Sequence, residues 1–323
     1  MTRSSTIVRR VRGALRRPGT QGRAGGRRGQ GTQSRAGAWD GVASRVAEEG
    51  AERLRAGAVH SRYDQLQPLP ECPPGWHTGP PDFVIIGAQK CGTTWWQGLI
   101  EGHPQVARPP GQRRELHFFD HFWDRWPRQE QLELYARYFP RPEGSLAGEK
   151  TPGYLYQPWV APMLARAAPE ARLIVLMRDP VERYASGLGL LQRAGALKGE
   201  IGAGEIGLRE HRITEAIERG RYAAQLTWWL ERYPREQLLL LQYERCVADA
   251  QEQLTRTFGF LGLPDHHASR AEIARTRKKS GSRPDVPAEM RQLLAEHYTA
   301  DVAHLMELEP SLDLELWPSV RRD

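Results

Sequence analysis

The sequence has few lysines and few cysteines, and it has no long apolar run. Lysine and arginine together number 46 among the 323 residues, yet only five of the 46 are lysines. Because arginine supplies almost every positive charge, a remaining lysine indicates a position where a compact ammonium serves and a planar guanidinium does not. We therefore treat these positions as candidates for a shared site: Lys90, Lys150, Lys198, Lys278 and Lys279.

The three cysteines, Cys72, Cys91 and Cys246, are too few and too far apart for a disulfide framework or a zinc site. This scarcity predicts a reducing, cytoplasmic location. A transmembrane helix needs about 18 or more consecutive apolar residues, and the sequence contains no such run. The basic amino terminus also lacks the continuous apolar stretch of a secretory signal. Abundant arginine, alanine and glycine predict a GC-rich, bacterial gene.

The net charge of +7 is unevenly placed, because residues 1–37 hold many arginines and no acid. Such a segment could bind nucleic acid or an anionic membrane surface. Its Gly, Arg, Gln and Ser content favours a disordered, solvated tail, so no stable nucleic-acid partner is expected. Residues 39–57 predict one short amphipathic helix, and the proline-rich stretch 67–81 predicts a linker. We therefore divide the chain into a tail and linker, 1–78, and a folded domain, 79–323.

Three short apolar runs inside this domain predict buried strands, at residues 83–86, 172–177 and 237–243. Each run is followed by a loop and a helical pattern, which extends to about residue 101 after the first run and to about 260 after the third. Residues 212–233 also predict a helix. Apolar runs that do not alternate are typical of parallel strands buried on both faces. The repeated strand, loop and helix predict a three-layer α/β domain, in which ligands bind at the carboxyl ends of the strands.

The first of these loops, GAQKCGTTWW at residues 87–96, has the G-x-x-x-x-G spacing of a phosphate-binding loop. Backbone amides of such a turn and of the following helix form an anion site, to which Thr93 and Thr94 add hydroxyls. An ordinary tight turn would share the glycine spacing but not the paired threonines and the lysine. A nucleotide triphosphatase would place its lysine directly after Gly92, whereas here the lysine is Lys90.

Three further motifs carry candidate site residues. Arg178 ends the second strand, and Ser186 lies two turns into the next helix, so both could reach one phosphate. Asp179 and Pro180 between them also fit a plain helix cap, and both interpretations can hold. In RELHFFD, Glu115 and His117 share one face of an extended chain and could handle protons, although such a pair is more often structural. Glu149 and Lys150 of GEKTP, at 148–152, could form a surface ion pair before a turn. On a strand, however, Glu149 would point away from the face of Lys150 and serve structure.

Taken together, these motifs resemble the sulfotransferases that use 3′-phosphoadenosine-5′-phosphosulfate. The loop FVIIGAQKCGTTWW is similar to their 5′-phosphosulfate motif, and LIVLMRDPVERYASG to their 3′-phosphate motif. RELHFFD and GEKTPGYL are most similar to the heparan sulfate 3-O-sulfotransferases, with a weaker similarity to the N-sulfotransferase domains. RKKSGSRPDVP resembles a late loop that closes over the cofactor. The resemblance runs from about residue 82 to the carboxyl terminus.

The resemblance implies a P-loop-like sulfotransferase fold and sulfuryl transfer to an acceptor hydroxyl, with 3′,5′-adenosine bisphosphate as product and no metal. It implies that Glu115 is the general base, in preference to Glu149, that His117 and Asp120 support it, and that Lys90 and Lys150 stabilise the leaving phosphate. Catalysis then depends mostly on positioning and electrostatics. The implied cofactor-binding residues are Lys90, Cys91, Gly92, Thr93, Thr94, Trp95, Arg178, Ser186, Lys279, Gly281, Ser282 and Arg283.

The sequence also departs from the heparan sulfate enzymes, because it lacks their cysteine pair and their luminal membrane anchor. We therefore expect a carbohydrate, glycolipid or secondary-metabolite acceptor rather than a Golgi-type glycan. Two alternatives stay open at this stage. A P-loop kinase would use the same loop geometry with a magnesium carboxylate, and a nucleic-acid-binding protein would use the basic tail. The sequence does not determine the oligomeric state.

Overall fold

A computed structural model of the chain describes residues 66–111, 115–193, 213–276 and 286–321. The predicted helix at 39–57, the arginine-rich tail and the late loop residues Lys279, Gly281, Ser282 and Arg283 lie outside these ranges. The residues just before the predicted domain boundary contact the domain: the backbone carbonyl of Gln67 accepts from Tyr138, and Leu66 and Leu69 pack against the core.

The centre of the fold is a four-stranded sheet in the order β4-β2-β5-β6, with every pair parallel. The strands are β2 (Phe83–Gly87), β4 (Gly148–Lys150), β5 (Arg172–Met177) and β6 (Leu238–Gln242). All residues of β2 and β6 are buried, as expected for apolar runs covered on both faces. The three predicted strands and their parallel pairing are confirmed, and β4 is a fourth, shorter strand.

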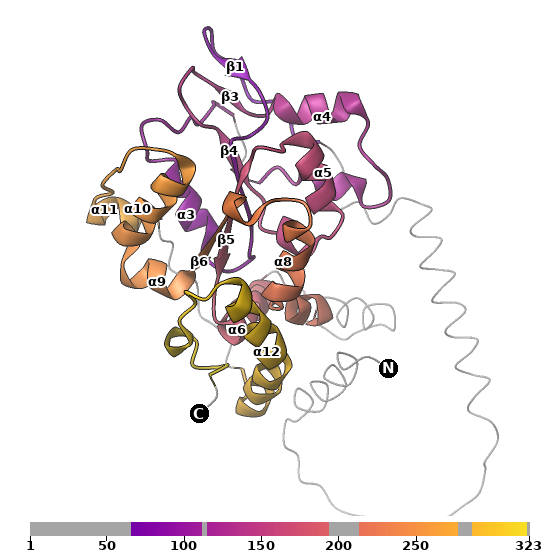
Figure 1. Cartoon of the computed structure of the whole chain (residues 1–323), viewed down its shortest axis with the longest axis vertical. Coiled ribbons are helices and arrows are strands. Elements are labelled where there is room, and N and C mark those ends of the chain that lie inside the picture. Colours follow the sequence, from indigo (N-terminus) through magenta and orange to yellow (C-terminus); the bar gives the residue numbers. More distant parts are fainter. Residues whose placement is uncertain (1–65, 112–114, 194–212, 277–285, 322–323) are drawn as a thin grey trace, which may run out of the picture.

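Helices cover both faces of this sheet (Figure 1). On one side lie α3 (Thr93–Ile100), α9 (Tyr243–Ala248), α10 (Ala250–Leu261) and α11 (Arg270–Thr276). On the other side lie α5 (Val160–Ala167) and α8 (Tyr222–Leu230), with α6 (Pro180–Arg193) and α12 (Ala288–Leu308) below them in this view. The predicted three-layer α/β fold is therefore confirmed.

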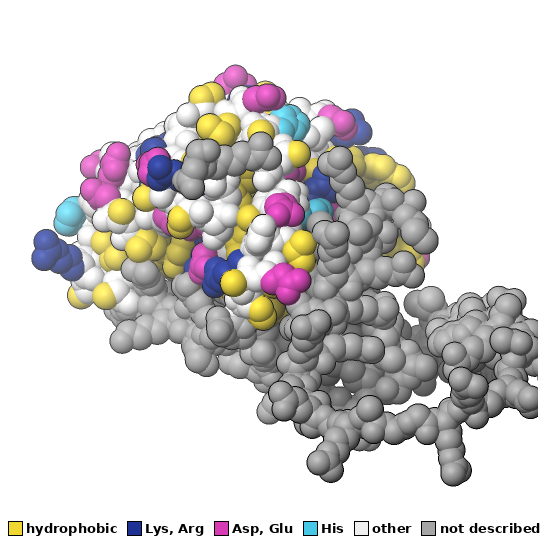
Figure 2. All heavy atoms as spheres, turned by 90° about the horizontal axis from the view of Figure 1, so that it is seen from below, with side chains coloured by type: hydrophobic (Ala, Val, Ile, Leu, Met, Phe, Trp, Pro, Cys, Tyr) yellow, Lys and Arg dark blue, Asp and Glu magenta, His cyan; other side chains and the backbone are white. Residues whose placement is uncertain are grey.

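The remaining elements are short. A small sheet pairs β1 (His77–Thr78) with β3 (Pro140–Arg141), antiparallel, and α4 (Gln129–Ala136) lies near it (Figure 1). Single 3-10 turns are η1 (Phe118–Phe122), η2 (Tyr154–Tyr156), η3 (Arg235–Gln237) and η4 (Leu314–Leu316). Over the described ranges, no helix has both the length and the apolar character that a membrane crossing requires. On the face shown in Figure 2, acidic, basic and apolar side chains are interspersed.

Two predicted helices are each interrupted, the first at a single residue and the second over a short turn. The segment after β6 forms α9 and α10 because Asp249 begins a new helix, where its carboxylate accepts from the backbone of Glu252. The helix predicted over 212–233 is interrupted over residues 219–221, around Gly220, before α8 begins. A Cβ atom at Gly220 would lie 2.8 Å from the Tyr298 ring. The turn at Gly220 thus lies in close contact with Tyr298 of α12, a contact between distant segments that the local periodicity of the sequence does not reveal.

We expect Gly220→Ala to destabilise the domain by about 1–3 kcal/mol, because the added methyl group overpacks a buried contact with Tyr298. Gly259→Ala is the matched control: Gly259 lies inside α10 and its Cβ would meet no atom within 4 Å, so alanine should be neutral or slightly stabilising. Urea unfolding measures both variants. Equal unfolding midpoints for the two variants would contradict this account of the helix break.

Candidate active site

The loop from β2 to α3 turns sharply at two residues with left-handed backbone conformation, Lys90 with φ of 74° and Gly92 with φ of 87°. Glycine is required at position 92 for a second reason, because a Cβ there would lie 2.8 Å from the ring of Tyr243. A lysine in this conformation is uncommon and strained, and such strain is concentrated at functional sites. The structure therefore distinguishes Lys90 by its backbone as well as by its rarity.

The amino-terminal end of α3 is suited to an anion. Its N-cap residue is Gly92, which has no side chain to accept hydrogen bonds from the amides of the first turn. The positive end of the helix thus points toward the loop without a capping oxygen from its own N-cap residue. Thr93 is buried and Thr94 is half-buried in that first turn. These groups fit the phosphate end of a nucleotide.

Lys150, at the end of β4, connects this loop to a carboxylate. Its side chain is 1% exposed, and its Nζ donates to Thr94 Oγ1 at 2.8 Å and to Glu115 Oε1 at 2.5 Å. The interpretation of Glu149 and Lys150 as a surface ion pair is wrong. Both are buried, and they point to opposite faces of the strand, as alternation requires. Lys150 is paired with Glu115, which lies 35 residues away in the sequence.

Glu115, His117 and Asp120 form a linear hydrogen-bonded chain. His117 Nε2 lies 3.1 Å from Glu115 Oε2, and Nδ1 lies 2.8 Å from Asp120 Oδ2. Each ring nitrogen of His117 thus contacts one carboxylate. The predicted proximity of Glu115 and His117 is observed, but the backbone between them is not a simple extended strand. His117 has a φ of 52° and is the N-cap of η1, and its amide donates to Thr151 Oγ1 at 3.3 Å.

Burial, hydrogen bonds and neighbouring charges together set the pKa values of His117 and Glu115 in this chain. Burial lowers the pKa of His117, but hydrogen bonds to Asp120 and Glu115 outweigh it and raise the pKa to about 9. Burial raises the pKa of Glu115, but the hydrogen bond from His117 and the charge of Lys150 outweigh it and lower the pKa to about 2. At neutral pH, His117 is therefore an imidazolium that donates from both nitrogens, and Glu115 is a carboxylate.

The other candidate base, Glu149, lies in a different environment. It is 2% exposed and accepts from the hydroxyl of Tyr135 at 2.6 Å and from Thr151 Oγ1 at 2.8 Å. Burial raises its pKa to about 7, although these two donors act in the opposite direction. Through Thr151, which also accepts from the His117 amide, Glu149 supports the backbone that carries the Glu115 chain.

The second predicted motif lies at the carboxyl end of β5. Asp179 Oδ1 accepts from the amides of Val181 at 2.9 Å and Glu182 at 3.2 Å, so the predicted helix cap is confirmed. Arg178 is 6% exposed and Ser186 is 8% exposed. The Arg178 guanidinium lies 5.1 Å from the centre of the Tyr243 ring and 3.6 Å from Glu182, while its buried Nε has no hydrogen-bond partner among the described residues. A buried donor of this kind fits an acceptor supplied by a ligand.

The side chains of two predicted cofactor-binding residues, Cys91 and Trp95, point into the protein core. Cys91 is fully buried, its sulfur lies 3.5 Å from the hydroxyl of Tyr222, and burial raises the pKa of the thiol to about 11. Trp95 is 4% exposed and donates to the carbonyl of Ile273 at 3.2 Å. Both side chains therefore support the loop from the core, and any ligand contact they make would come from their backbone.

Sequence reasoning missed Tyr243, which contacts both phosphate motifs. Its ring packs against Gly92 and lies under the guanidinium of Arg178. Tyr243 directly follows β6, so the rule that ligands bind beyond the carboxyl ends of parallel strands could have found it. Thr151 was also missed, although it follows β4 at the same edge of the sheet.

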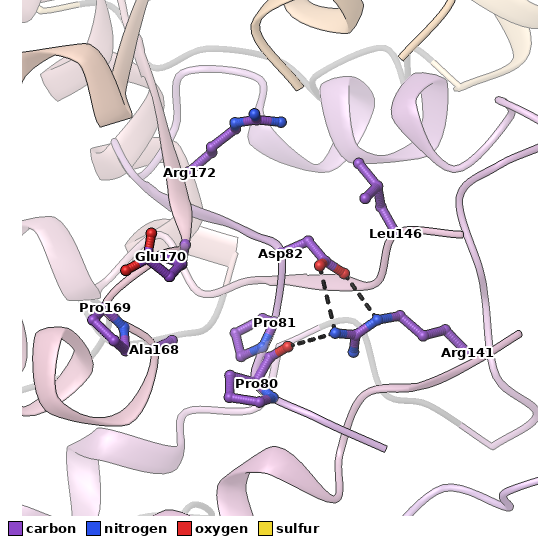
Figure 3. A pocket seen from close by; sticks show the side chains of 10 residues that line it. Pro80, Pro81, Asp82, Arg141, Leu146, Ala168, Pro169, Glu170 and Arg172 are labelled. Atoms are coloured by element: carbon purple, nitrogen blue, oxygen red, sulfur yellow. Dashed lines mark hydrogen bonds and ion pairs between the residues drawn. The ribbon is translucent and has the colours of Figure 1, made fainter. Parts of the chain in front are cut away.

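A separate cavity of about 520 Å³ lies at the opposite edge of the sheet (Figure 3). Its lining includes Asp82, directly before β2, and Arg172, the first residue of β5. The Arg141 guanidinium lies against Asp82, with 3.1 Å between Nε and Oδ2, and also donates to the carbonyl of Pro80 (Figure 3). Because this cavity lies at the amino ends of the strands, it is distinct from the candidate active site.

Comparison with known proteins gives consistent matches. Residues 80–293 match the sulfotransferase domain family. Human heparan sulfate glucosamine 3-O-sulfotransferase 3B1 is 31% identical over 191 residues, which make up 57% of this chain and 46% of that protein. Human heparan sulfate glucosamine 3-O-sulfotransferase 6 is 31% identical over 220 residues, or 63% and 61% of the two chains. This chain thus spans about half the length of these relatives.

A solved structure agrees with the sequence matches. The crystal structure of a sulfotransferase from Alicyclobacillus acidocaldarius is 26% identical, with a TM-score of 0.57, and the match covers 74% of this chain and 98% of that one. The similarity to sulfotransferases that the motifs indicate, and to their heparan sulfate branch in particular, is therefore confirmed.

We expect the imidazole of His117 to titrate near pH 9, because two carboxylates stabilise its protonated form. In Asp120→Asn one of these charges is lost, so the pKa should fall toward its ordinary value of about 6.5. Nuclear magnetic resonance of the ring measures both, with His117→Asn assigning the signal. A wild-type pKa near 6.5, unchanged in Asp120→Asn, would contradict the charge assignment.

Proposed function

The chain belongs to the sulfotransferase family, and from this premise we propose that it transfers a sulfuryl group from 3′-phosphoadenosine-5′-phosphosulfate to an acceptor hydroxyl. The observation that carries the proposal is the contact of buried Lys150 with both Thr94 and Glu115. This contact joins the anion-binding end of α3 to a carboxylate. A donor phosphate and a proton acceptor can therefore act on the same reacting atoms.

The residues divide into two groups by their expected contacts. Gly92, Thr93 and Thr94 at the start of α3 would hold the 5′ side of the donor, and Arg178 with Ser186 would hold its 3′-phosphate. The orphaned Nε of Arg178 and the uncapped helix end support this assignment. When bound, the donor supplies the sulfuryl group and departs as 3′,5′-adenosine bisphosphate.

The proton of the acceptor hydroxyl would pass to Glu115. Its carboxylate is ionised at neutral pH, and His117 and Asp120 hold it in one orientation. While His117 and Lys150 both donate to it, Glu115 is a weak base, so loss of the Lys150 contact would strengthen it. Lys150 and Lys90 are the cations available to neutralise charge that grows on the donor phosphate. The lysine scarcity supports both roles.

The acceptor is proposed as a carbohydrate-type hydroxyl, because the matched human relatives are named as glucosamine 3-O-sulfotransferases. A glycolipid or a secondary metabolite would present the same group. The cytoplasmic location, the bacterial origin of the gene, the absence of a metal and the boundary between residues 78 and 79 stay predictions.

Ligand binding tests the donor without knowledge of the acceptor. We expect the protein to bind 3′,5′-adenosine bisphosphate, and Arg178→Ala to weaken this binding by roughly tenfold to a hundredfold, the effect of losing one hydrogen bond to a charged group. Binding of adenosine 5′-phosphate, which lacks the 3′-phosphate, should change little. Arg166→Ala, on the exposed side of α5, is the matched control.

Calorimetric titration gives these affinities. Equal losses for the two nucleotides would remove Arg178 from the 3′-phosphate site. Preference for ATP with magnesium over the bisphosphate would favour the kinase alternative instead.

Substitution of the two glutamates tests the base. Glu115→Gln preserves shape but cannot accept a proton, so single-turnover sulfuryl transfer to glucosamine-containing oligosaccharides should fall by roughly 10²–10⁴, with bisphosphate affinity nearly intact. Glu149→Gln should lower the rate only modestly and reduce the free energy of unfolding, because Glu149 supports Thr151 and Tyr135 from within the core. An inactive Glu149→Gln beside a normal Glu115→Gln would reverse the assignment.

A further inference from the structure

The segment after α12 returns to the edge of the sheet where the candidate active site lies. It contains η4 and Trp317, and it runs beside α9 and α6 (Figure 1). Asp313, the N-cap of η4, exchanges two hydrogen bonds with the side chain of Gln242, the last residue of β6. Its amide donates to Gln242 Oε1 at 3.1 Å, and its carbonyl accepts from Gln242 Nε2 at 2.8 Å. The segment is therefore attached directly before Tyr243, which contacts both phosphate motifs.

Trp317 is fully buried and contacts two polar side chains. Its indole Nε1 donates to Glu244 Oε2 at 2.8 Å, and its ring centre lies 6.0 Å from that of Tyr222. A buried indole needs an acceptor for its N–H, and here the acceptor is a carboxylate. Trp317 therefore restricts the positions of both Glu244 and Tyr222.

These two side chains bind one and the same peptide group. The hydroxyl of Tyr222 donates to the carbonyl of Arg178 at 2.8 Å, and Glu244 Oε1 accepts from the amide of Asp179 at 3.1 Å. That carbonyl and that amide belong to the peptide bond between Arg178 and Asp179. Both of its polar groups are thus paired with side chains that contact Trp317.

The segment after α12 also holds the side chain of Asp179. The amide of Ser319 donates to Asp179 Oδ2 at 3.1 Å, while Oδ1 accepts from the amides of the first turn of α6. The carboxylate is buried between these donors. The same segment therefore fixes the start of α6, the helix that carries Ser186.

We propose that Trp317 is a positioning residue for the 3′-phosphate of the donor, and that it acts through the peptide bond between Arg178 and Asp179. The inference rests on the proposed function, in which Arg178 binds that phosphate. Hydrogen bonds weaken with small changes of distance and angle, so the contact between guanidinium and phosphate depends on where this peptide bond lies. The buried Nε of Arg178, which has no partner among the described residues, is directed by that backbone.

Nucleotide binding to Trp317→Phe tests the proposal. The variant keeps a ring against Tyr222 and removes the N–H that orients Glu244. We expect binding of 3′,5′-adenosine bisphosphate to weaken by roughly threefold to tenfold, the effect of one hydrogen bond of ordinary strength. Binding of adenosine 5′-phosphate should change little. Calorimetric titration gives the ratio of the two affinities, and circular dichroism confirms that the variant is folded.

Trp229→Phe is the matched control. Trp229 is also fully buried, and its indole donates to the carbonyl of Leu155 at 3.4 Å. A loss of stability alone would affect both tryptophan variants and leave the ratio of the two nucleotide affinities as in the wild type. We expect this ratio to fall in Trp317→Phe and to be unchanged in Trp229→Phe.

Two further variants test the route of the effect. If Trp317 acts through Arg178, Trp317→Phe should cause no additional loss of bisphosphate affinity in a protein that already carries Arg178→Ala. Tyr222→Phe keeps the ring beside Trp317 and removes the hydroxyl that holds the same peptide bond, so it should also lower the ratio. This variant decides the question if Trp317→Phe does not fold.

An unchanged ratio in Trp317→Phe or in Tyr222→Phe would overturn the proposal, and so would additive losses in the combination with Arg178→Ala. In those cases, a selective loss in Arg178→Ala alone would leave the proposed donor site intact. A wild-type protein that binds the bisphosphate no more tightly than adenosine 5′-phosphate would overturn the donor site and the positioning role together.

Discussion

The buried ammonium of Lys150 is the interaction on which the arrangement of the site depends. A charged group removed from water is strongly unfavourable unless it is paired and hydrogen-bonded. Its position at the end of β4 allows only two described partners, Thr94 from the start of α3 and Glu115 from the segment before η1. The need to pair this charge therefore brings three separate segments together at one edge of the sheet.

The pairing of the Lys150 ammonium also contributes to the charge states of the neighbouring side chains. Glu115 remains ionised because both Lys150 and His117 donate to it, and His117 remains protonated because it lies between two carboxylates. On the other face of the strand, Glu149 accepts from the hydroxyls of Tyr135 and Thr151, and its burial outweighs these donors and the charge of His117, so its pKa rises. The pKa is therefore lowered for Glu115, which contacts Lys150, and raised for Glu149, which precedes Lys150 in the sequence, and the surroundings alone cause the difference.

The same edge of the sheet organises the nucleotide side. Gly92 and Arg178 follow neighbouring parallel strands, β2 and β5, and Tyr243 follows the next strand, β6. Gly92 and Arg178 therefore both contact the ring of Tyr243. That ring excludes any side chain at position 92 and positions the guanidinium of Arg178. Two residues before Gly92, Lys90 has a left-handed backbone conformation that a lysine rarely adopts.

Local pattern in the sequence determined the strands β2, β5 and β6, the capped start of α6 and the residue types of the motifs, because each depends on neighbours a few positions away. It also indicated Lys90 and Lys150 through the scarcity of lysine. Strand alternation already directed Glu149 away from Lys150. Only the tertiary structure decided that Lys150 pairs with Glu115, that Gly220 and Asp249 break predicted helices, and that Tyr243 joins the two phosphate motifs. Those outcomes depend on distances between segments far apart in the chain, and burial and pKa follow from such distances rather than from sequence spacing.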